Sequence, residues 1–179
     1  MAARYIVLDR DGVINEDSDC FIKSPQEWQP ITGSLEAIAR LHQHGYRIVV
    51  ITNQSGVGRG LFDEKTLQAI HRKMLMSIRQ AHGDISAIYY CPHAPEAGCA
   101  CRKPNPGLMK QFSREHGVDL SNLPMIGDSL RDLQAASAVS ATPILVRTGK
   151  GERITRHMIT TDIPVFENLY EASIALIQS

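Results

Sequence analysis

Residues 5–14 read YIVLDRDGVI, and this stretch is the strongest indication of the fold. A run of apolar side chains leads directly into Asp9 and Asp11, with Arg10 between them and Gly12 after them. A continuous apolar run is typical of a strand that is buried on both faces of a parallel sheet. Because side chains two residues apart lie on the same side of an extended chain, Asp9 and Asp11 can face one ligand. We therefore expect a buried strand that ends at a functional pair of carboxylates.

Apolar blocks alternate with segments of helical periodicity along the rest of the chain. The blocks predict strands at residues 4–8, 47–52, 85–91, 124–127 and 142–146. The periodic segments predict helices at residues 35–41, 64–82, 106 onward, 129–138 and 168–178, with Pro106 at the first helical position of the third. Such alternation implies parallel pairing through right-handed crossovers. We predict an α/β fold with a doubly wound, mostly parallel sheet, as one domain over residues 1–179 without a large cap domain.

The charge balance argues against several classes of partner. Lysine plus arginine and aspartate plus glutamate number 19 each, and 43% of the residues are hydrophobic. There is no basic excess of the kind that nucleic acid or an anionic membrane attracts. No apolar run is long enough to span a bilayer, and the first residues lack the layout of a signal peptide. We expect a cytoplasmic protein that acts on a small molecule, and a monomer is the plausible oligomeric state.

Polar side chains follow the predicted strands at the point where each one ends. In open parallel sheets, ligands bind beyond the carboxyl ends of the strands. Each of these residues alone is as readily a turn or cap residue, but together they form an ordered set at one edge of the sheet. The set comprises Asp9 and Asp11 after the first strand, Thr52, Asn53, Gln54 and Ser55 at the second, Arg102 and Lys103 after the third, and Asp128 after the fourth.

This set has the chemistry of a phosphate-transfer site. Asp9 and Asp128 can share a hard cation such as Mg²⁺, which prefers oxygen ligands. The cation and Lys103 would neutralise a bound phosphate, so that the Asp9 carboxylate attacks phosphorus and forms an aspartyl-phosphate. Asp11 is placed to protonate the leaving oxygen and later to activate water. Thr52 would hydrogen-bond the phosphoryl oxygens.

The same segments resemble the four motifs of the haloacid dehalogenase superfamily phosphatases, and the resemblance covers nearly the whole chain. The matching segments are Asp9-Arg10-Asp11-Gly12-Val13, Thr52-Asn53-Gln54-Ser55-Gly56, Arg102-Lys103-Pro104, and Gly127-Asp128-Ser129 with Asp132. The resemblance implies that Asp9 is the nucleophile and Asp11 the general acid and base. It also implies that Asp9, Asp128 and the backbone carbonyl of Asp11 hold Mg²⁺, and that Thr52 and Lys103 stabilise the phosphoryl group.

A second, compact cluster predicts a zinc site. Cys91, His93, Cys99 and Cys101 lie within eleven residues. One imidazole and three thiolates suit a closed tetrahedral Zn²⁺ site, which would be structural because no position stays open for water. The alternative is a loop of ordinary reduced cysteines. Metal binding would supply folding energy to a loop with few apolar residues. Cys20 lies far away in sequence and is predicted to be a plain thiol.

Within the superfamily, the zinc loop resembles the group that contains histidinol-phosphate phosphatases and heptose bisphosphate phosphatases. Residues 9–15, 21–28 and 53–60 are similar to the heptose branch. The resemblance implies hydrolysis of the 7-phosphate of D-glycero-D-manno-heptose 1,7-bisphosphate, which leaves heptose 1-phosphate for ADP-heptose and lipopolysaccharide core synthesis. Histidinol phosphate is the alternative substrate, and a non-catalytic, zinc-stabilised binding module is the alternative of a different class.

The long polar loops supply the candidate contacts to the sugar and to the second phosphate. By resemblance, Arg102 would hold the phosphate that is not cleaved, and a guanidinium fork suits a phosphate dianion. Trp28 is predicted to pack under the first loop. The other candidate substrate-binding residues are Asp17, Asp19, Asn53, Gln54, Ser55 and Arg59.

Overall fold

A six-stranded sheet forms the centre of the molecule in the computed structural model, which describes residues 4–159 and 162–178. All neighbouring strands are parallel, in the order β3-β2-β1-β4-β5-β6. The predicted α/β fold is therefore confirmed. The strands are β1 (Arg4–Leu8), β2 (Tyr46–Asn53), β3 (Ala87–Cys91), β4 (Pro124–Gly127), β5 (Thr142–Val146) and β6 (Val165–Phe166).

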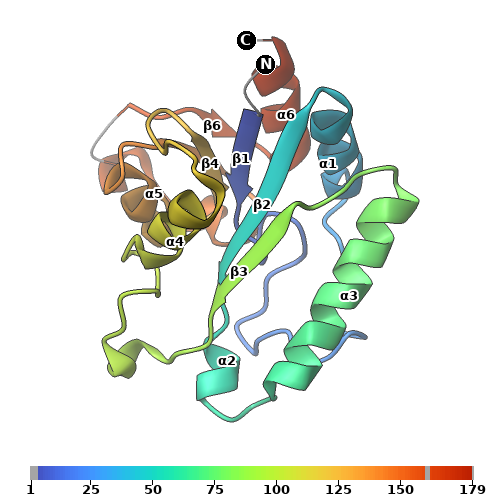
Figure 1. The fold of residues 1–179 in the computed structure, drawn as a ribbon, viewed down its shortest axis with the longest axis vertical. Coiled ribbons are helices and arrows are strands. Elements are labelled where there is room, and N and C mark those ends of the chain that lie inside the picture. The colour runs from blue at the N-terminus through green and yellow to red at the C-terminus, as the bar shows by residue number, and fades with distance from the viewer. Residues whose placement is uncertain (1–3, 160–161, 179) are drawn as a thin grey trace.

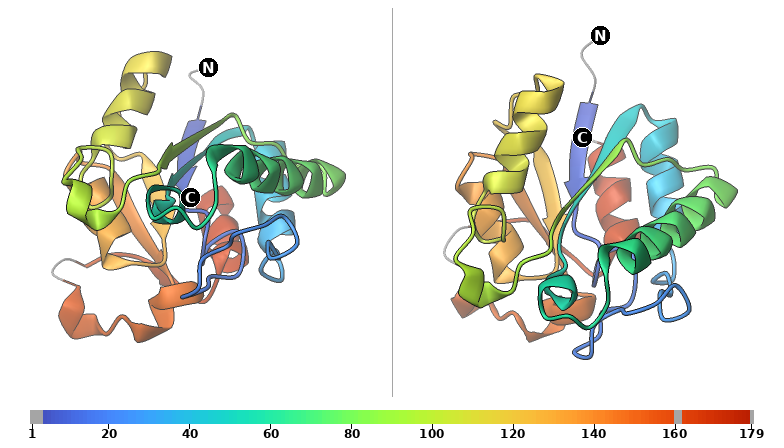
Figure 2. Two further views of the ribbon diagram at one scale, coloured as in Figure 1. Left: turned by 90° about the horizontal axis from the view of Figure 1, so that it is seen from below. Right: turned by 60° about the horizontal axis from the view of Figure 1, so that its bottom comes forward.

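Helices cover both faces of the sheet, as the doubly wound prediction requires (Figure 1). One face carries α1 (Ser34–Gln43), α3 (Glu64–Gln80) and α6 (Leu169–Gln178), and the other carries α4 (Gly107–His116) and α5 (Leu130–Ser137). The views in Figure 2 show the loops that leave the carboxyl ends of the strands gathered at one edge of the sheet. Short helices lie in the connections: α2 (Ser55–Gly58) and 3₁₀ turns at Pro95–Ala97, Gly149–Arg153 and Arg156–Met158.

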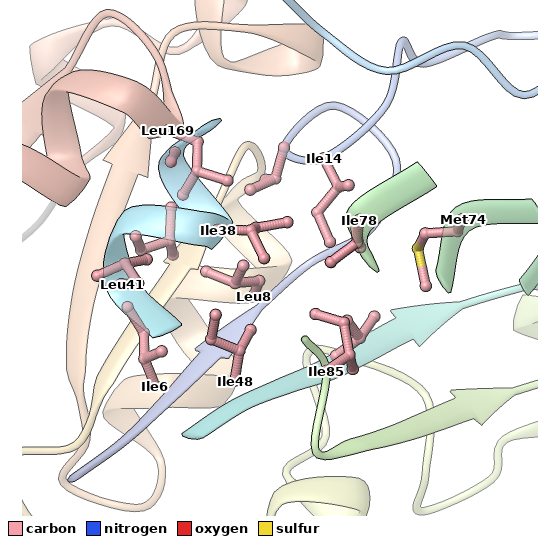
Figure 3. Packing of buried hydrophobic residues seen from close by; sticks show 14 of the residues in the cluster. Ile6, Leu8, Ile14, Ile38, Leu41, Ile48, Met74, Ile78, Ile85 and Leu169 are labelled. Atoms are coloured by element: carbon pink, nitrogen blue, oxygen red, sulfur yellow. The ribbon is translucent and has the colours of Figure 1, made fainter. Parts of the chain in front are cut away.

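The central strands bury both of their faces, which explains their unbroken apolar sequence. In β1, Ile6 and Leu8 pack toward α1, α3 and α6, whereas Val7 packs toward α4. Figure 3 shows the first of these clusters, in which Leu8 lies beside Ile38 of α1 and Ile6 lies nearer to Leu41 of the same helix. Trp28 lies in the same cluster and is fully buried, so its predicted packing role is confirmed. Each face of the sheet thus has its own core, and both cores hold β1 in place.

Most predicted elements are confirmed, and the differences lie at their ends. The strands at residues 4–8, 124–127 and 142–146 have the predicted bounds. The prediction for Pro106 was wrong, because its carbonyl accepts the first helical hydrogen bond, from the Lys110 amide at 3.0 Å. Pro106 therefore occupies the N-cap, and α4 begins at Gly107. The sequence did not predict α2 or β6, since four-residue and two-residue elements carry no periodicity.

The connection from β1 to α1 carries no inserted domain within the described part of the chain. It folds back on itself through isolated bridges that pair Asn15 with Asp11 and with Pro30. This agrees with the prediction that no large cap covers the carboxyl edge of the sheet. Among the described helices, none is long and apolar enough to cross a membrane. The assignment of residues 1–179 to one domain stays a prediction.

Candidate active site

A pocket of about 290 Å³ opens at the carboxyl ends of β1, β2 and β4. It lies where ligands bind in open parallel sheets, next to the point at which the strand order reverses. Every predicted catalytic, magnesium-binding and substrate-binding side chain lines it. These are Asp9, Asp11, Asp17, Asp19, Thr52, Asn53, Gln54, Ser55, Arg59, Arg102, Lys103 and Asp128.

Lys103 is the cation at the floor of this pocket, with only 2% of its surface exposed. Its Nζ lies 3.0 Å from Asp9 Oδ1 and 2.7 Å from Asp132 Oδ1, and it donates to the Ile51 carbonyl at 2.8 Å. Burial alone would lower the pKa of Lys103, but Asp132 and Asp9 outweigh it and raise that pKa above its ordinary value. Lys103 is therefore a charged ammonium held between two carboxylates.

Asn53 fixes the backbone of this lysine. Its side-chain amide donates to the Lys103 carbonyl at 3.1 Å and accepts from the Lys103 amide at 3.0 Å. These two hydrogen bonds attach the segment after β3 to the end of β2. The structure thus places Asn53, a predicted substrate-binding residue, as a support of Lys103.

Three buried carboxylates form the candidate metal centre. The nearest oxygens of Asp9, Asp128 and Asp132 all lie within 4.8 Å of one another. Burial, and then Asp132, raises the pKa of Asp9 well above its ordinary value, and the same two causes raise the pKa of Asp128 to about 7. Lys103 is the single cation in direct contact with this set among the described residues, so negative charge is in excess. An all-oxygen, negatively charged site fits a hard divalent cation such as Mg²⁺.

Asp132 differs from the other two carboxylates because its oxygens are already engaged. It accepts from the Ser129 amide at 3.0 Å and from the Ser129 hydroxyl at 2.7 Å, which caps α5, and it pairs with Lys103. The sequence assigned Asp132 to a motif but to no role. The structure shows it as the residue that orients Lys103.

Two glycines let the chain close tightly around Asp128. Gly12 and Gly149 have φ angles of 81° and 58°, a region that favours glycine. A Cβ atom on either residue would collide with the Asp128 carboxylate. The Lys150 amide donates to Asp128 Oδ2 at 2.8 Å, and the Thr148 hydroxyl donates to the Gly12 carbonyl at 2.7 Å. The loop after β5 therefore sets the direction of this carboxylate.

Asp11 is held by four hydrogen-bond donors. Arg10 donates from Nε at 3.0 Å and from Nη2 at 3.1 Å, while the amides of Asn15 and Gln54 each donate at 2.8 Å. Burial alone would raise the pKa of Asp11, but Arg10, Asn15 and Gln54 together bring that pKa below its ordinary value. Gln54 also donates to the Thr52 hydroxyl at 3.0 Å, so its amide nitrogen is used inside the protein.

The mouth of the pocket is charged on both sides. Asp17 pairs with the Lys150 ammonium at 3.0 Å. Asp19 lies 3.9 Å from an exposed arginine of the loop after β5, the loop that carries Lys150. Arg59 lies 3.9 Å from an exposed glutamate, and Arg102 donates to the His93 carbonyl at 3.3 Å. Arg131 and Lys150 also line the pocket, and the sequence did not single them out because neither lies at a strand end.

The predicted zinc ligands converge beside Arg102. The Cys101 sulfur lies 3.0 Å from that of Cys91, 3.4 Å from that of Cys99 and 3.3 Å from His93 Nδ1. Cys91 lies 3.5 Å from Cys99 and 3.6 Å from His93 Nδ1. No disulfide joins these cysteines. Four donors at such mutual distances could hold a tetrahedral zinc ion.

Comparisons with known proteins agree with this architecture. A family model described as HAD-hyrolase-like matches residues 100–172. A Bordetella bronchiseptica protein named D-glycero-beta-D-manno-heptose-1,7-bisphosphate 7-phosphatase is 55% identical over 150 residues, which are 84% of each chain. A Pseudomonas aeruginosa protein of the same name is 46% identical over 178 residues, covering 99% of this chain and 100% of the relative.

Solved structures extend the similarity to three dimensions. A crystal structure of D,D-heptose 1.7-bisphosphate phosphatase from B. bronchiseptica, complexed with magnesium and phosphate, superimposes with a TM-score of 0.94 at 50% identity and 98% coverage of both chains. A corresponding structure from Burkholderia thailandensis gives a TM-score of 0.77 at 40% identity, covering 98% of this chain and 99% of the other.

Proposed function

Because this chain belongs to the D-glycero-beta-D-manno-heptose-1,7-bisphosphate 7-phosphatase family of the haloacid dehalogenase superfamily, we propose that it hydrolyses the 7-phosphate of that β-heptose bisphosphate. The chain is thus a phosphoric monoester hydrolase. One observation carries the proposal: a single pocket combines the four motif carboxylates, a buried lysine and arginines beyond them. The product, heptose 1-phosphate, would serve ADP-heptose and lipopolysaccharide core synthesis.

The reaction has two steps, in which Asp9 acts as the nucleophile and Asp11 as the general acid and base. In the first, an Asp9 oxygen attacks phosphorus, the ester P–O bond breaks, and Asp11, which takes up a proton as the phosphate dianion binds, gives that proton to the departing sugar oxygen. In the second, water attacks the aspartyl-phosphate, Asp11 takes a proton from that water, and the bond between phosphorus and Asp9 breaks. Inorganic phosphate leaves, and both carboxyl groups return to their starting state.

The remaining residues bind and orient the transferred group. Lys103 and the Thr52 hydroxyl would contact the phosphoryl oxygens, where fixed donors stabilise the developing charge. Asp9, Asp128 and the Asp11 carbonyl would hold Mg²⁺, which neutralises phosphate charge during transfer. Among the described residues, the all-oxygen set around Asp128 fits that ion. Zinc would be held by the separate cysteine and histidine cluster.

The function is tested by comparing phosphate release from three compounds by purified protein. We expect the β-heptose bisphosphate to give the highest kcat/KM, followed by its α anomer and then by histidinol phosphate. Preference for histidinol phosphate would overturn the substrate assignment, and release from none of them would overturn the function. Monomeric state and cytoplasmic location stay predictions.

Arg102 is expected to recognise the phosphate that is not cleaved. It lines the pocket apart from the carboxylate floor, beside Arg59 and Arg131. Arg102→Ala removes a charge-assisted contact, so kcat/KM for the bisphosphate should fall by about 10- to 100-fold. For heptose 7-phosphate, which lacks the second phosphate, the same substitution should lower kcat/KM only slightly. Arg114→Ala, at an exposed position of α4, is the matched control. Equal losses on both substrates would contradict the assignment.

Removal of zinc is expected to raise KM more than it lowers kcat. The loop holds Arg102 through the His93 carbonyl, whereas Lys103 has separate supports in Asn53 and Ile51. Chelation should therefore weaken the binding of the second phosphate by Arg102 and leave the reacting groups in place. Steady-state kinetics, with metal content measured in parallel, will check this. Zinc should restore KM, and full activity in verified zinc-free protein would refute the idea.

Cys20, the exposed cysteine outside the cluster, provides a matched control for this experiment. Cys101→Ser removes a predicted ligand and should reproduce the effect of chelation. Cys20→Ser changes a free, exposed thiol outside the cluster and should leave KM as in the unmodified protein. The comparison separates loss of the metal site from a general effect of replacing a thiol.

A further inference from the structure

Arg10 is a fully buried cation behind the active site. Its side chain has no exposed surface, although it stands between two residues of the pocket. Nε and Nη2 donate to Asp11, and Nη1 lies 3.2 Å from Nε2 of His71, a residue of α3. A buried guanidinium is costly unless its donors are paired. These contacts engage all three guanidinium nitrogens, and the second partner, His71, comes from a distant part of the chain.

His71 acts in this pair as a neutral acceptor. Only 7% of its surface is exposed. Burial, followed by the charge of Arg10, lowers the pKa of His71 to about 3, so the ring is uncharged at neutral pH. With Nη1 as the donor, Nε2 must carry the lone pair and Nδ1 the proton. The imidazole therefore orients the guanidinium without adding a second charge to the interior.

The direction of the guanidinium determines that of Asp11. Both oxygens of this carboxylate receive one bond from Arg10 and one from an amide, those of Asn15 and Gln54. The two amides are neutral, so Arg10 supplies the charge-assisted part of the contact, which is also the stronger part. A displacement of the fork would turn the carboxylate on which both proton transfers depend. Helix α3 thus reaches the acid and base group through two side chains.

We infer that Arg10 and His71 form a positioning pair that orients the Asp11 carboxylate, chiefly for hydrolysis of the aspartyl-phosphate. The inference rests on the proposed function, because it requires Asp11 to act as acid and base. In that step the water oxygen bonds to phosphorus, its proton passes to Asp11, and the bond from phosphorus to Asp9 breaks. The attacking water has no covalent tether, so its alignment depends on the carboxylate that accepts its proton.

Two replacements of His71 separate orientation from packing. His71→Leu removes the acceptor and keeps an apolar side chain, whereas His71→Gln offers an amide oxygen near the position of Nε2. We expect His71→Leu to lower kcat by about tenfold, a part of the factor that proton-transfer catalysis contributes, and to lower KM with it, because a slower second step lets the phosphoenzyme accumulate. His71→Gln should recover most of that loss. Heptose bisphosphate labelled at the cleaved phosphate, quenched in acid during turnover, should show more covalent phosphoenzyme in His71→Leu than in unmodified protein.

A buried residue of the same helix is the matched control. Met74→Ala weakens the packing of α3 but removes no contact of Arg10, so it should not raise the phosphoenzyme fraction. Arg10→Lys keeps the charge and loses the fork, and it should raise that fraction while His71 is intact. This variant serves if His71→Leu does not fold.

Several results would overturn the inference. They are a His71→Gln protein as slow as His71→Leu, a change in KM alone, or a phosphoenzyme fraction that stays at the level of unmodified protein in the Arg10→Lys and His71→Leu variants. Failure of the proposed function has a different signature. In that case unmodified protein itself releases no phosphate from heptose bisphosphate.

Discussion

Turnover is expected to fall by at least about 10³-fold when Asp9 is replaced by asparagine, the scale of loss seen when a nucleophile is removed. The amide has nearly the shape of the carboxylate but cannot form the acyl phosphate. Phosphate release by Asp9→Asn, measured with the heptose bisphosphate, checks the result. Asp119→Asn, at an exposed position that accepts a hydrogen bond from the Ser121 amide, is the control and should turn over normally.

The same substitution should leave the fold intact, for an electrostatic reason. Burial and Asp132 raise the pKa of Asp9 well above its ordinary value, and Lys103 opposes the rise only in part because it also pairs with Asp132. A group whose pKa is raised on folding contributes stability at low pH and loses it as pH increases through the folded-state pKa. At neutral pH without metal, the raised pKa of Asp9 therefore means a cost to folding, which a neutral amide does not carry.

Thermal unfolding in metal-free buffer separates the two roles of Asp9. The Tm of Asp9→Asn should equal or exceed that of the unmodified protein at neutral pH. Added Mg²⁺ should raise the Tm of the unmodified protein more, because the variant lacks one predicted ligand. Normal turnover by the variant would refute the nucleophile assignment, and an unfolded variant would show that Asp9 is structural.

Lys103→Met is expected to damage both stability and catalysis. It leaves Asp9 and Asp132 buried with no cation in contact, and breaking a buried ion pair on one side costs about 3–5 kcal/mol. Burial raises the pKa of Asp132, and in the intact protein Lys103 and two Ser129 hydrogen bonds bring it below its ordinary value. Without Lys103 that pKa rises. The loss of stability should therefore be largest at neutral pH and shrink in acid, where the carboxyl groups take up protons.

Urea unfolding at pH 7.5 and pH 5 measures this loss. Lys110→Met, at an exposed position of α4, is the matched control and should unfold as the unmodified protein does. Adding Asp132→Asn to Lys103→Met should recover part of the stability but none of the activity. Activity itself should fall by about 100-fold or more, because a fixed cation at the transferred phosphoryl group is lost. Unchanged stability of Lys103→Met at pH 7.5 would contradict the ion-pair argument.

The sheet and most of its strands follow from the sequence because the two cores leave no polar face on β1 or on the middle of β2. A short apolar run without alternation is typical of a strand that is covered on both sides by helices. The two-residue β6 could not be found this way. Its residues are only half-buried and pair with β5 at two positions, so no pattern distinguishes them from a loop.

The sequence predicted which residues lie at the site, but it did not predict which atoms their side chains contact. Because the carboxyl ends of parallel strands meet at one edge of the sheet, Asp9, Thr52 and Asp128 come together there regardless of their side-chain conformations. This arrangement of the strands says nothing of rotamers. Alternation directs Arg10 away from the pocket, yet its long side chain folds back onto Asp11. Asn53 was predicted to touch substrate, and its amide is engaged by Lys103. Its role in substrate binding stays a prediction.

The central place of β1 in the sheet has a consequence for synthesis on the ribosome. One edge of β1 pairs with β2, but its other edge pairs with β4, which lies much later in the chain. Until β4 emerges, a nascent chain exposes an unpaired apolar strand edge, the kind of surface that recruits other chains. Pairing with β4 covers that edge and, through the Asp9 amide bond to the Ile126 carbonyl, draws the two metal-binding segments together. Protection from aggregation and assembly of the catalytic centre are thus one folding event, and it comes late in translation.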